Sequence, residues 1–170
     1  MIRPAWKTKR SSNSHIMAVP ASTAAQIAAA IRKFDPALAR TIREVRAALR
    51  ARFPTAYELV YDNYNFFVIG YSATERPSDC VVSLAANAKG VGLSFYRGAD
   101  IADPHGLLEG SGSQNRFIRL PDGAEKLARR EVATLIDLAE RQAPAPMRRH
   151  GRNVVILRSV SVKQRPRRLP

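Results

Sequence analysis

The stretch "CVVSLAANAKGVGLSFYR", residues 80–97, contains two runs of alternating residues on either side of a short polar turn. In the second run, "VGLSFY", every other residue is a large apolar one, whereas Gly92, Ser94 and Tyr96 share the opposite face of an extended chain. The turn "NAKG" is typical of a hairpin, because a lysine and a glycine suit an exposed bend. The stretch therefore predicts two antiparallel strands with one apolar face and one face of small, polar and aromatic residues.

Three further runs have the same two-residue period. "AYELVYDN" and "NFFVIGYS" precede the hairpin and "NRFIRL" follows it, and all are rich in valine, phenylalanine or other strand formers and bounded by turn residues. The short links between most of these runs favour antiparallel pairing. A strand at residues 153–162, "NVVILRSVSV", would be the sixth.

Helical signals flank the five runs on both sides. An alanine-rich segment capped by Ser22 or Thr23 ends near Phe34, and "DPALARTIREVRAALRARF" follows with Asp35 as its N-cap. After the fifth run, "PDGAEKLARREVATLIDLAERQA" is predicted as one helix capped by Asp122. We therefore expect an α+β fold: an antiparallel sheet of about five or six strands, with N-terminal and C-terminal helices packed on it.

The charge of +14 is concentrated at the two ends of the 170-residue chain. Residues 1–18 hold four Lys and Arg and residues 146–170 hold eight, both without an acid, whereas residues 19–145 hold 16 basic and 14 acidic groups. We expect a disordered basic tail at 1–18 and one α+β domain at 19–145. Residues 146–170 would form a linker, an extra edge strand at 153–162 and a second basic tail.

These ends suggest partners. Cationic tails attract polyanions without sequence preference, so a weak nucleic-acid accessory role is an alternative function. The strand at 153–162 either returns to its own sheet or pairs with a second chain in a homodimer, and Met1 and Met17 are both candidate starts; the sequence leaves these choices open. The single cysteine, Cys80, suits a reducing cytoplasm, and no run approaches the roughly 20 apolar residues of a membrane span.

Catalytic motifs are missing from the sequence. The segment "EGSGSQ" does not have the G-x-S-x-G spacing of a nucleophile turn, and no Gly-Lys-Ser/Thr follows it as a phosphate loop requires. His105 lies in a turn, and the other two histidines are His15 and His150 in the tails. We therefore expect a binding protein rather than an enzyme, and we expect no metal or cofactor.

A glycine-rich stretch, "PHGLLEGSGSQNRFIRL" at residues 104–120, is the best candidate for a ligand site. Backbone N–H groups in such a loop can hold an anion, and a neighbouring arginine adds a positive charge. The alternation of side chains along the strands adds polar and aromatic groups to this candidate site, from the run "AYELVYDN" and the turn after it and from the hairpin at residues 80–97. The expected site comprises Tyr61, Asp62, Tyr64, Ser94, Tyr96, Gly110, Ser111, Gly112 and Arg116. The alternative is ordinary sheet packing, in which Asp62 neutralises Arg116 and the glycines serve only the turn.

The segments "KGVGLSFYRGADIADPHGLLEGSGSQNRFIRL", "REVATLIDLA" and "SVSVKQRPRR" together resemble the YdhG-like family of domains of unknown function, over about residues 38–168. The resemblance implies an α+β domain on an antiparallel sheet, and some members of that family are described as frataxin-like iron chaperones. Iron needs several oxygen donors close together, but the first long helix holds one carboxylate, Glu44. We expect a non-catalytic module that binds a small ligand or a partner, with the iron chaperone as a further alternative.

Overall fold

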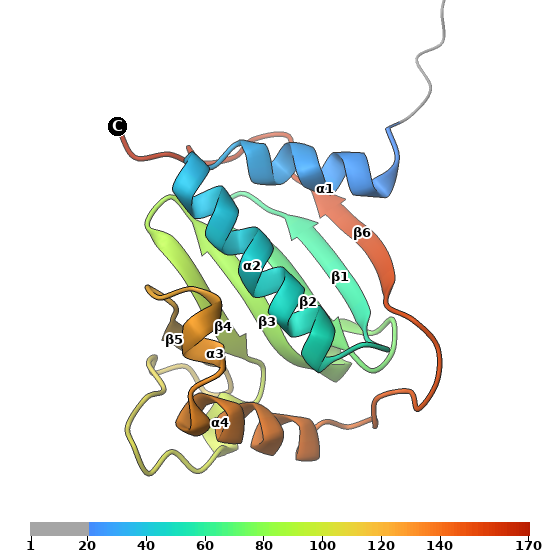
Figure 1. The fold of residues 1–170 in the computed structure, drawn as a ribbon, viewed down its shortest axis with the longest axis vertical. Helices are drawn as coiled ribbons and strands as arrows, with labels where there is room; N and C mark the ends of the chain where they lie inside the picture. Colours follow the sequence, from blue (N-terminus) through green and yellow to red (C-terminus); the bar gives the residue numbers. More distant parts are fainter. Residues whose placement is uncertain (1–20) are drawn as a thin grey trace, which may run out of the picture.

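The computed structural model describes residues 21–170, and the tail expected at 1–18 lies outside the described residues. The structure has the expected α+β class: helices lie on one side of a six-stranded sheet (Figure 1). The strands are β1 (Tyr57–Asp62), β2 (Phe67–Ser72), β3 (Cys80–Asn87), β4 (Gly90–Phe95), β5 (Arg116–Arg119) and β6 (Val154–Val160).

The sheet order is β5-β4-β3-β2-β1-β6. The first five strands form an antiparallel meander, as their short links predicted. The sixth strand pairs in parallel with β1, so the sheet is mixed, and the strand at 153–162 returns to its own sheet. This parallel pairing follows from the long excursion through the C-terminal helices, which brings the chain back to the end of the sheet where β1 begins (Figure 1).

The two N-terminal helices begin as their sequences predict. In α1 (Thr23–Arg32), Ser22 Oγ accepts a hydrogen bond from the Ala25 N–H at 3.2 Å. In α2 (Pro36–Arg52), Asp35 Oδ1 accepts one from the Ala37 N–H at 2.9 Å. Each side chain satisfies a backbone donor that the first helical turn would leave unpaired. The apolar stripe of α2 then packs on the sheet and is buried.

The prediction of a single C-terminal helix is wrong, because the structure has two helices there, α3 (Ala124–Leu127) and α4 (Arg130–Arg141). Asp122 does not cap α3, whose N-cap is Gly123 at φ +59°. The Asp122 carboxylate accepts a hydrogen bond from Arg129 Nη2 at 2.6 Å, across the bend between the two helices. Two short 3₁₀ turns, η1 (Pro77–Asp79) and η2 (Gly98–Asp100), complete the elements.

The C-terminal segment is not the solvated basic tail that its composition suggested. After β6 the chain turns back past α1 (Figure 1), and the Arg167 side chain is only 2% exposed. Its Nη2 donates to Asp62 Oδ1 at 3.0 Å and to the Asn63 carbonyl, while Arg168 donates to carbonyls at the α1–α2 turn. A buried carboxylate on β1 supplies the counter-charge that allows this arginine to enter the fold.

Candidate functional site

The helices of residues 21–170 cover one face of the sheet, and the opposite face of β2–β5 carries small side chains. The register places Gly70, Ser83, Ser94 and Phe117 side by side in one row across four strands. The next row contains Val68, Ala85, Gly92 and Arg119. Because glycine, alanine and serine project little, the middle of this face lies lower than its two sides.

A hollow of about 830 Å³ lies over this region. Ala85, Gly92, Ser83 and Ser94 form its floor. We call it the open-face hollow. Near the β3–β4 turn it continues round the end of the sheet to Leu38 and Thr41 of α2, and its other lining residues are Phe66, Val68, Asn87, Lys89, Gly90, Val91, Asn115, Phe117, Arg119, Leu120 and Pro121. Its volume falls within the range of about 300–1,000 Å³ that is usual for small-ligand sites.

Two aromatic rings stand on opposite sides of the open-face hollow. Phe66 precedes β2 and is 42% exposed, which is high for such a large apolar side chain. Phe117 lies on β5, three strands across the sheet, and the register also puts it four residues further along, because Phe66 lies level with Gly90 and Phe117 pairs with Ser94. With strand spacings of about 4.8 Å and about 3.3 Å per residue, the two residues are roughly 19 Å apart on a diagonal. Apolar rings at two corners of the hollow can contact the aromatic body of a ligand that rests on the small residues between them.

Among the described residues, two cations and no acid line the open-face hollow. Arg119 and Lys89 are its charged lining residues. The Arg119 guanidinium lies 5.9 Å from the centre of the Phe117 ring and donates through Nε to Glu109 Oε2 at 3.0 Å. This contact uses one of the five N–H donors of the guanidinium, and the side chain is 73% exposed. Arg119 therefore keeps donors for an anionic group of a ligand.

The glycine-rich loop contributes only Asn115 to the lining of the hollow and does not form an anion nest with Arg116. Arg116 Nη1 donates to the carbonyls of Gly112 and Asn115, so its guanidinium closes the loop on itself. In this closed loop the side chain of Asn115 lines the hollow, and its Oδ1 accepts a hydrogen bond from Ser94 Oγ at 2.7 Å. Gly110 has a φ of +106°, a conformation that disfavours any other residue.

The structure does not bring the nine expected site residues together. Ser94 lines the open-face hollow, whereas Gly110, Ser111, Gly112 and Arg116 belong to the exposed loop beside it. The tyrosines are separated because Tyr64 follows β1 at one end of the sheet and Tyr96 follows β4 at the other. In the meander, β2 and β3 lie between these two strands.

Tyr61 and Asp62 lie on β1 and face opposite sides of the sheet: Tyr61 is half-buried and pairs with Val68 in a row of the uncovered face, whereas Asp62 is buried on the side that the helices cover. The Tyr61 hydroxyl is buried without a hydrogen-bond partner, and burial raises its pKa. Asp62 pairs with Lys33 at 2.6 Å and with Arg167 at 3.0 Å, not with Arg116. Burial acts to raise the pKa of Asp62, but hydrogen bonds from Lys33, Gln164 and Arg167 hold it below its usual value. This ion-pair cluster fastens the C-terminal segment to the sheet.

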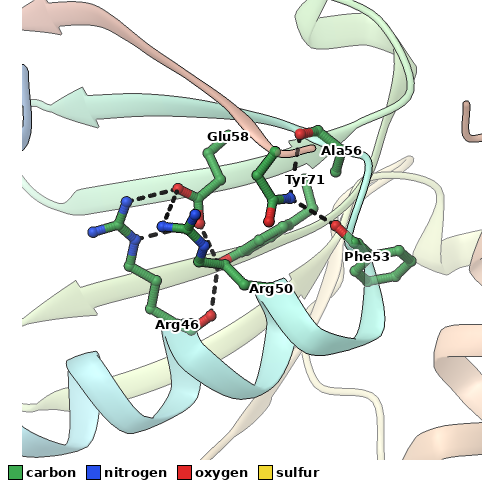
Figure 2. A network of polar contacts seen from close by, with 7 residues as sticks. Arg46, Arg50, Phe53, Ala56, Glu58 and Tyr71 are labelled. Carbon is green, nitrogen blue, oxygen red and sulfur yellow. Dashed lines mark hydrogen bonds and ion pairs between the residues drawn. The ribbon is translucent and has the colours of Figure 1, made fainter. Parts of the chain in front are cut away.

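A second buried carboxylate has an equally structural role (Figure 2). Glu58 on β1 accepts hydrogen bonds from Arg46 Nη2 at 2.6 Å and from the Tyr71 hydroxyl at 3.2 Å, with Arg50 Nη1 at 3.8 Å. Burial and the neighbouring carboxylate raise the pKa of Tyr71 well above its usual value. Both oxygens of Glu58 are occupied, so this cluster anchors α2 to the sheet and leaves no group free to react.

Asn153 completes the same region by donating through Nδ2 to the carbonyls of Phe53 and Ala56, at 2.7 and 3.3 Å. These bonds fix the entry to β6 beside the end of α2. Elsewhere in residues 21–170, no three His, Cys, Asp or Glu side chains are grouped so that they could hold a metal ion. In the same part of the chain, no helix combines the length and the hydrophobicity needed to cross a membrane.

Sequence reasoning missed most residues of the open-face hollow, among them Phe66, Ala85, Asn115 and Phe117. The alternation along each strand was the available signal, because it already placed Gly92 with Ser94. In comparisons with known proteins, no protein-family model, curated protein or solved structure matches the chain. The YdhG-like resemblance therefore stays a prediction from the quoted motifs.

Proposed function

We propose that the protein is a binding module that takes a small planar anion into the open-face hollow. The observation that carries this proposal is the pairing of a floor of glycine, alanine and serine with two flanking phenylalanines and two cations. A flat ring can approach such a floor closely, because no long side chain projects from it. The function proposed is the binding of a ligand, and no group in it is assigned to a reaction.

The lining supports an anionic rather than a neutral ligand. Arg119 presents a planar guanidinium that suits a carboxylate or phosphate, and Lys89 adds a second charge at the β3–β4 turn. Asn87 and Asn115 provide amide groups that can orient polar atoms of the same ligand. Contact with Phe66 and Phe117 favours an aromatic body.

The test uses a probe with this chemistry, 1-anilinonaphthalene-8-sulfonate, whose fluorescence rises in an apolar site. The neutral N-phenyl-1-naphthylamine has the same rings without the sulfonate. We expect the sulfonate to bind more tightly, and Arg119→Met to weaken only the sulfonate. One charge-assisted hydrogen bond contributes about 1.5–3 kcal/mol, which corresponds to roughly 10–100-fold in Kd.

A second variant tests the place of binding. Ala85→Leu adds bulk to the floor and should weaken both probes by about tenfold or more, because ring contact is lost. Ala51→Leu and Arg43→Met, both on the exposed side of α2, are the matched controls for added bulk and lost charge. Equal binding by Ala85→Leu and Ala51→Leu would show that the probes occupy another site and would overturn the proposal.

A further inference from the structure

Strand β6 leaves one edge of the sheet open. Among residues 21–170 it pairs with β1 alone, and its other edge has no strand partner. The opposite edge of the sheet is protected, because Glu109 and Phe117 exchange two backbone hydrogen bonds of 2.7 and 3.0 Å beside β5. Unpaired edges of this kind accept further strands, and proteins commonly block them with charges, prolines or covering segments.

The direction of the backbone groups follows from two hydrogen bonds of the edge strand to β1. The Val154 N–H donates to the Ala56 carbonyl at 3.1 Å, and the Ser161 N–H to the Asp62 carbonyl at 2.9 Å. Alternate residues of a strand direct their N–H and C=O groups to opposite sides. The backbone groups of Val155 and Val160 therefore point away from β1, toward the free edge.

Side chains around this edge favour an apolar neighbour. A crevice of about 200 Å³ separates α1 from β6; Leu157 and Val160 line it from the strand, and Gln26 and Ala29 from the helix. Val160 is 53% exposed. A strand added beside β6 could place an apolar side chain in this crevice while its backbone pairs with the edge.

Charge decides the kind of strand that fits. Residues 146–170 contain eight Lys and Arg and no Asp or Glu. Arg152 and Lys163 are exposed just before and just after β6, and Arg158 lies on the strand itself with its Nη2 donating to the Glu75 carbonyl. A second copy of β6 would bring the same cations to the interface, whereas an acidic segment would neutralise them.

We propose that the outer edge of β6 binds an extended acidic segment of a partner protein as a seventh strand. The interaction is independent of the open-face hollow, which lies over β2–β5. Backbone hydrogen bonds provide the attachment, the crevice beside α1 selects an apolar residue, and the flanking cations select acidic residues on either side of it.

The experiment titrates the full chain with a fluorescein-labelled short peptide of alternating valine and glutamate, followed by fluorescence polarisation. A peptide of alternating valine and lysine tests the charge. A valine–glutamate peptide with N-methyl groups at alternate residues keeps the side chains but lacks half of the N–H donors. We expect each altered peptide to bind about tenfold more weakly or worse.

Variants of the protein locate the contact. Val155→Pro removes one outward N–H, and Val155→Thr is the matched control that retains it; both are compared by thermal unfolding first. Lys163→Glu should weaken the acidic peptide and improve binding of the lysine peptide. Hydrogen exchange of the Val155 and Val160 amides should slow when the acidic peptide is bound.

Several results would overturn the proposal. One is equal binding of the N-methylated and unmethylated peptides, which would show attraction by charge without strand pairing. Displacement of the peptide by single-stranded oligothymidylate, unaffected by Val155→Pro, would reveal a polyanion surface instead. Slow hydrogen exchange of the Val155 and Val160 amides without peptide would mean that the edge is already paired. Sedimentation could also reveal a concentration-dependent dimer that Val155→Pro dissociates. Such a dimer would identify a second copy of the chain as the occupant of the edge.

Discussion

Replacement of Arg167 by methionine should destabilise the protein far more than a change at any solvated arginine. The Arg167 and Asp62 side chains are 2% and 3% exposed, and removal of one partner of a buried ion pair costs about 3–5 kcal/mol. Asp62 keeps its contact with Lys33 at 2.6 Å, and Lys33 is 42% exposed. This remaining partner places the expected loss at the lower end, about 3 kcal/mol.

The measurement is urea unfolding followed by far-ultraviolet circular dichroism, with thermal unfolding beside it. A loss of about 3 kcal/mol corresponds to a Tm lower by roughly 6–12 °C for a chain of this size. Arg165→Met is the matched control, because Arg165 is exposed and its guanidinium lies 5.6 Å from the Tyr64 ring. Its cost should stay within about 0.5 kcal/mol.

A double-mutant cycle with Asp62→Asn separates the ion pair from general packing. Asp62→Asn alone leaves the buried Arg167 guanidinium without a carboxylate, so it should also be strongly destabilising. Because both single variants lose the same contact, the double variant should cost less than the two together, by about 2 kcal/mol. Equal stability of Arg167→Met and Arg165→Met would refute the reasoning, because it would mean that the C-terminal segment is not docked.

Three further outcomes are expected. Hydrogen bonds to Asp62 overcome the effect of burial and lower the pKa of this carboxyl group. The contribution of Asp62 to stability is therefore complete above the unfolded-state pKa of about 3.9 and is lost as pH falls through the lower folded value. In urea unfolding, the free energies of unfolding of the wild type and of Asp62→Asn should converge below about pH 4. Gly110→Ala should cost about 1–2 kcal/mol in the same unfolding assay because of the φ of +106°, whereas Gly112→Ala, whose φ is not positive, should cost much less. Burial raises the pKa of the Cys80 thiol to about 11, so iodoacetamide near pH 8 should modify the native protein at least about 100-fold more slowly than the urea-unfolded chain, and equal rates would contradict its burial.

The elements of the fold could be predicted because their signals are local. Asp35 before Pro36, and the alternation on both sides of Lys89, each specify structure within a few residues. The parallel pairing of β6 with β1 could not be predicted in this way, because it depends on contacts between residues about 100 positions apart. The break between α3 and α4 was missed because Asp122 binds Arg129 instead of capping the helix.

The candidate site was only partly predictable, for a different reason. Strand parity placed Gly92 and Ser94 on one face of the hairpin, and both belong to the floor of the hollow. Tyr61 was expected beside these residues, but the meander puts two strands, β2 and β3, between β1 and β4. The burial of Arg167 was unforeseeable from composition, since arginine-rich ends are usually solvated and only the distant Asp62 makes this one an exception.

The pairing of the first strand with the last has a consequence for folding during synthesis. When β1 to β5 have left the ribosome, β1 is still an open edge, because its partner β6 has not yet been made. Gln164 and Arg167, which bind at Asp62, follow later still. The nascent chain must therefore hold an incomplete sheet in a state prone to strand exchange, and its final closure depends on long-range contacts that form slowly.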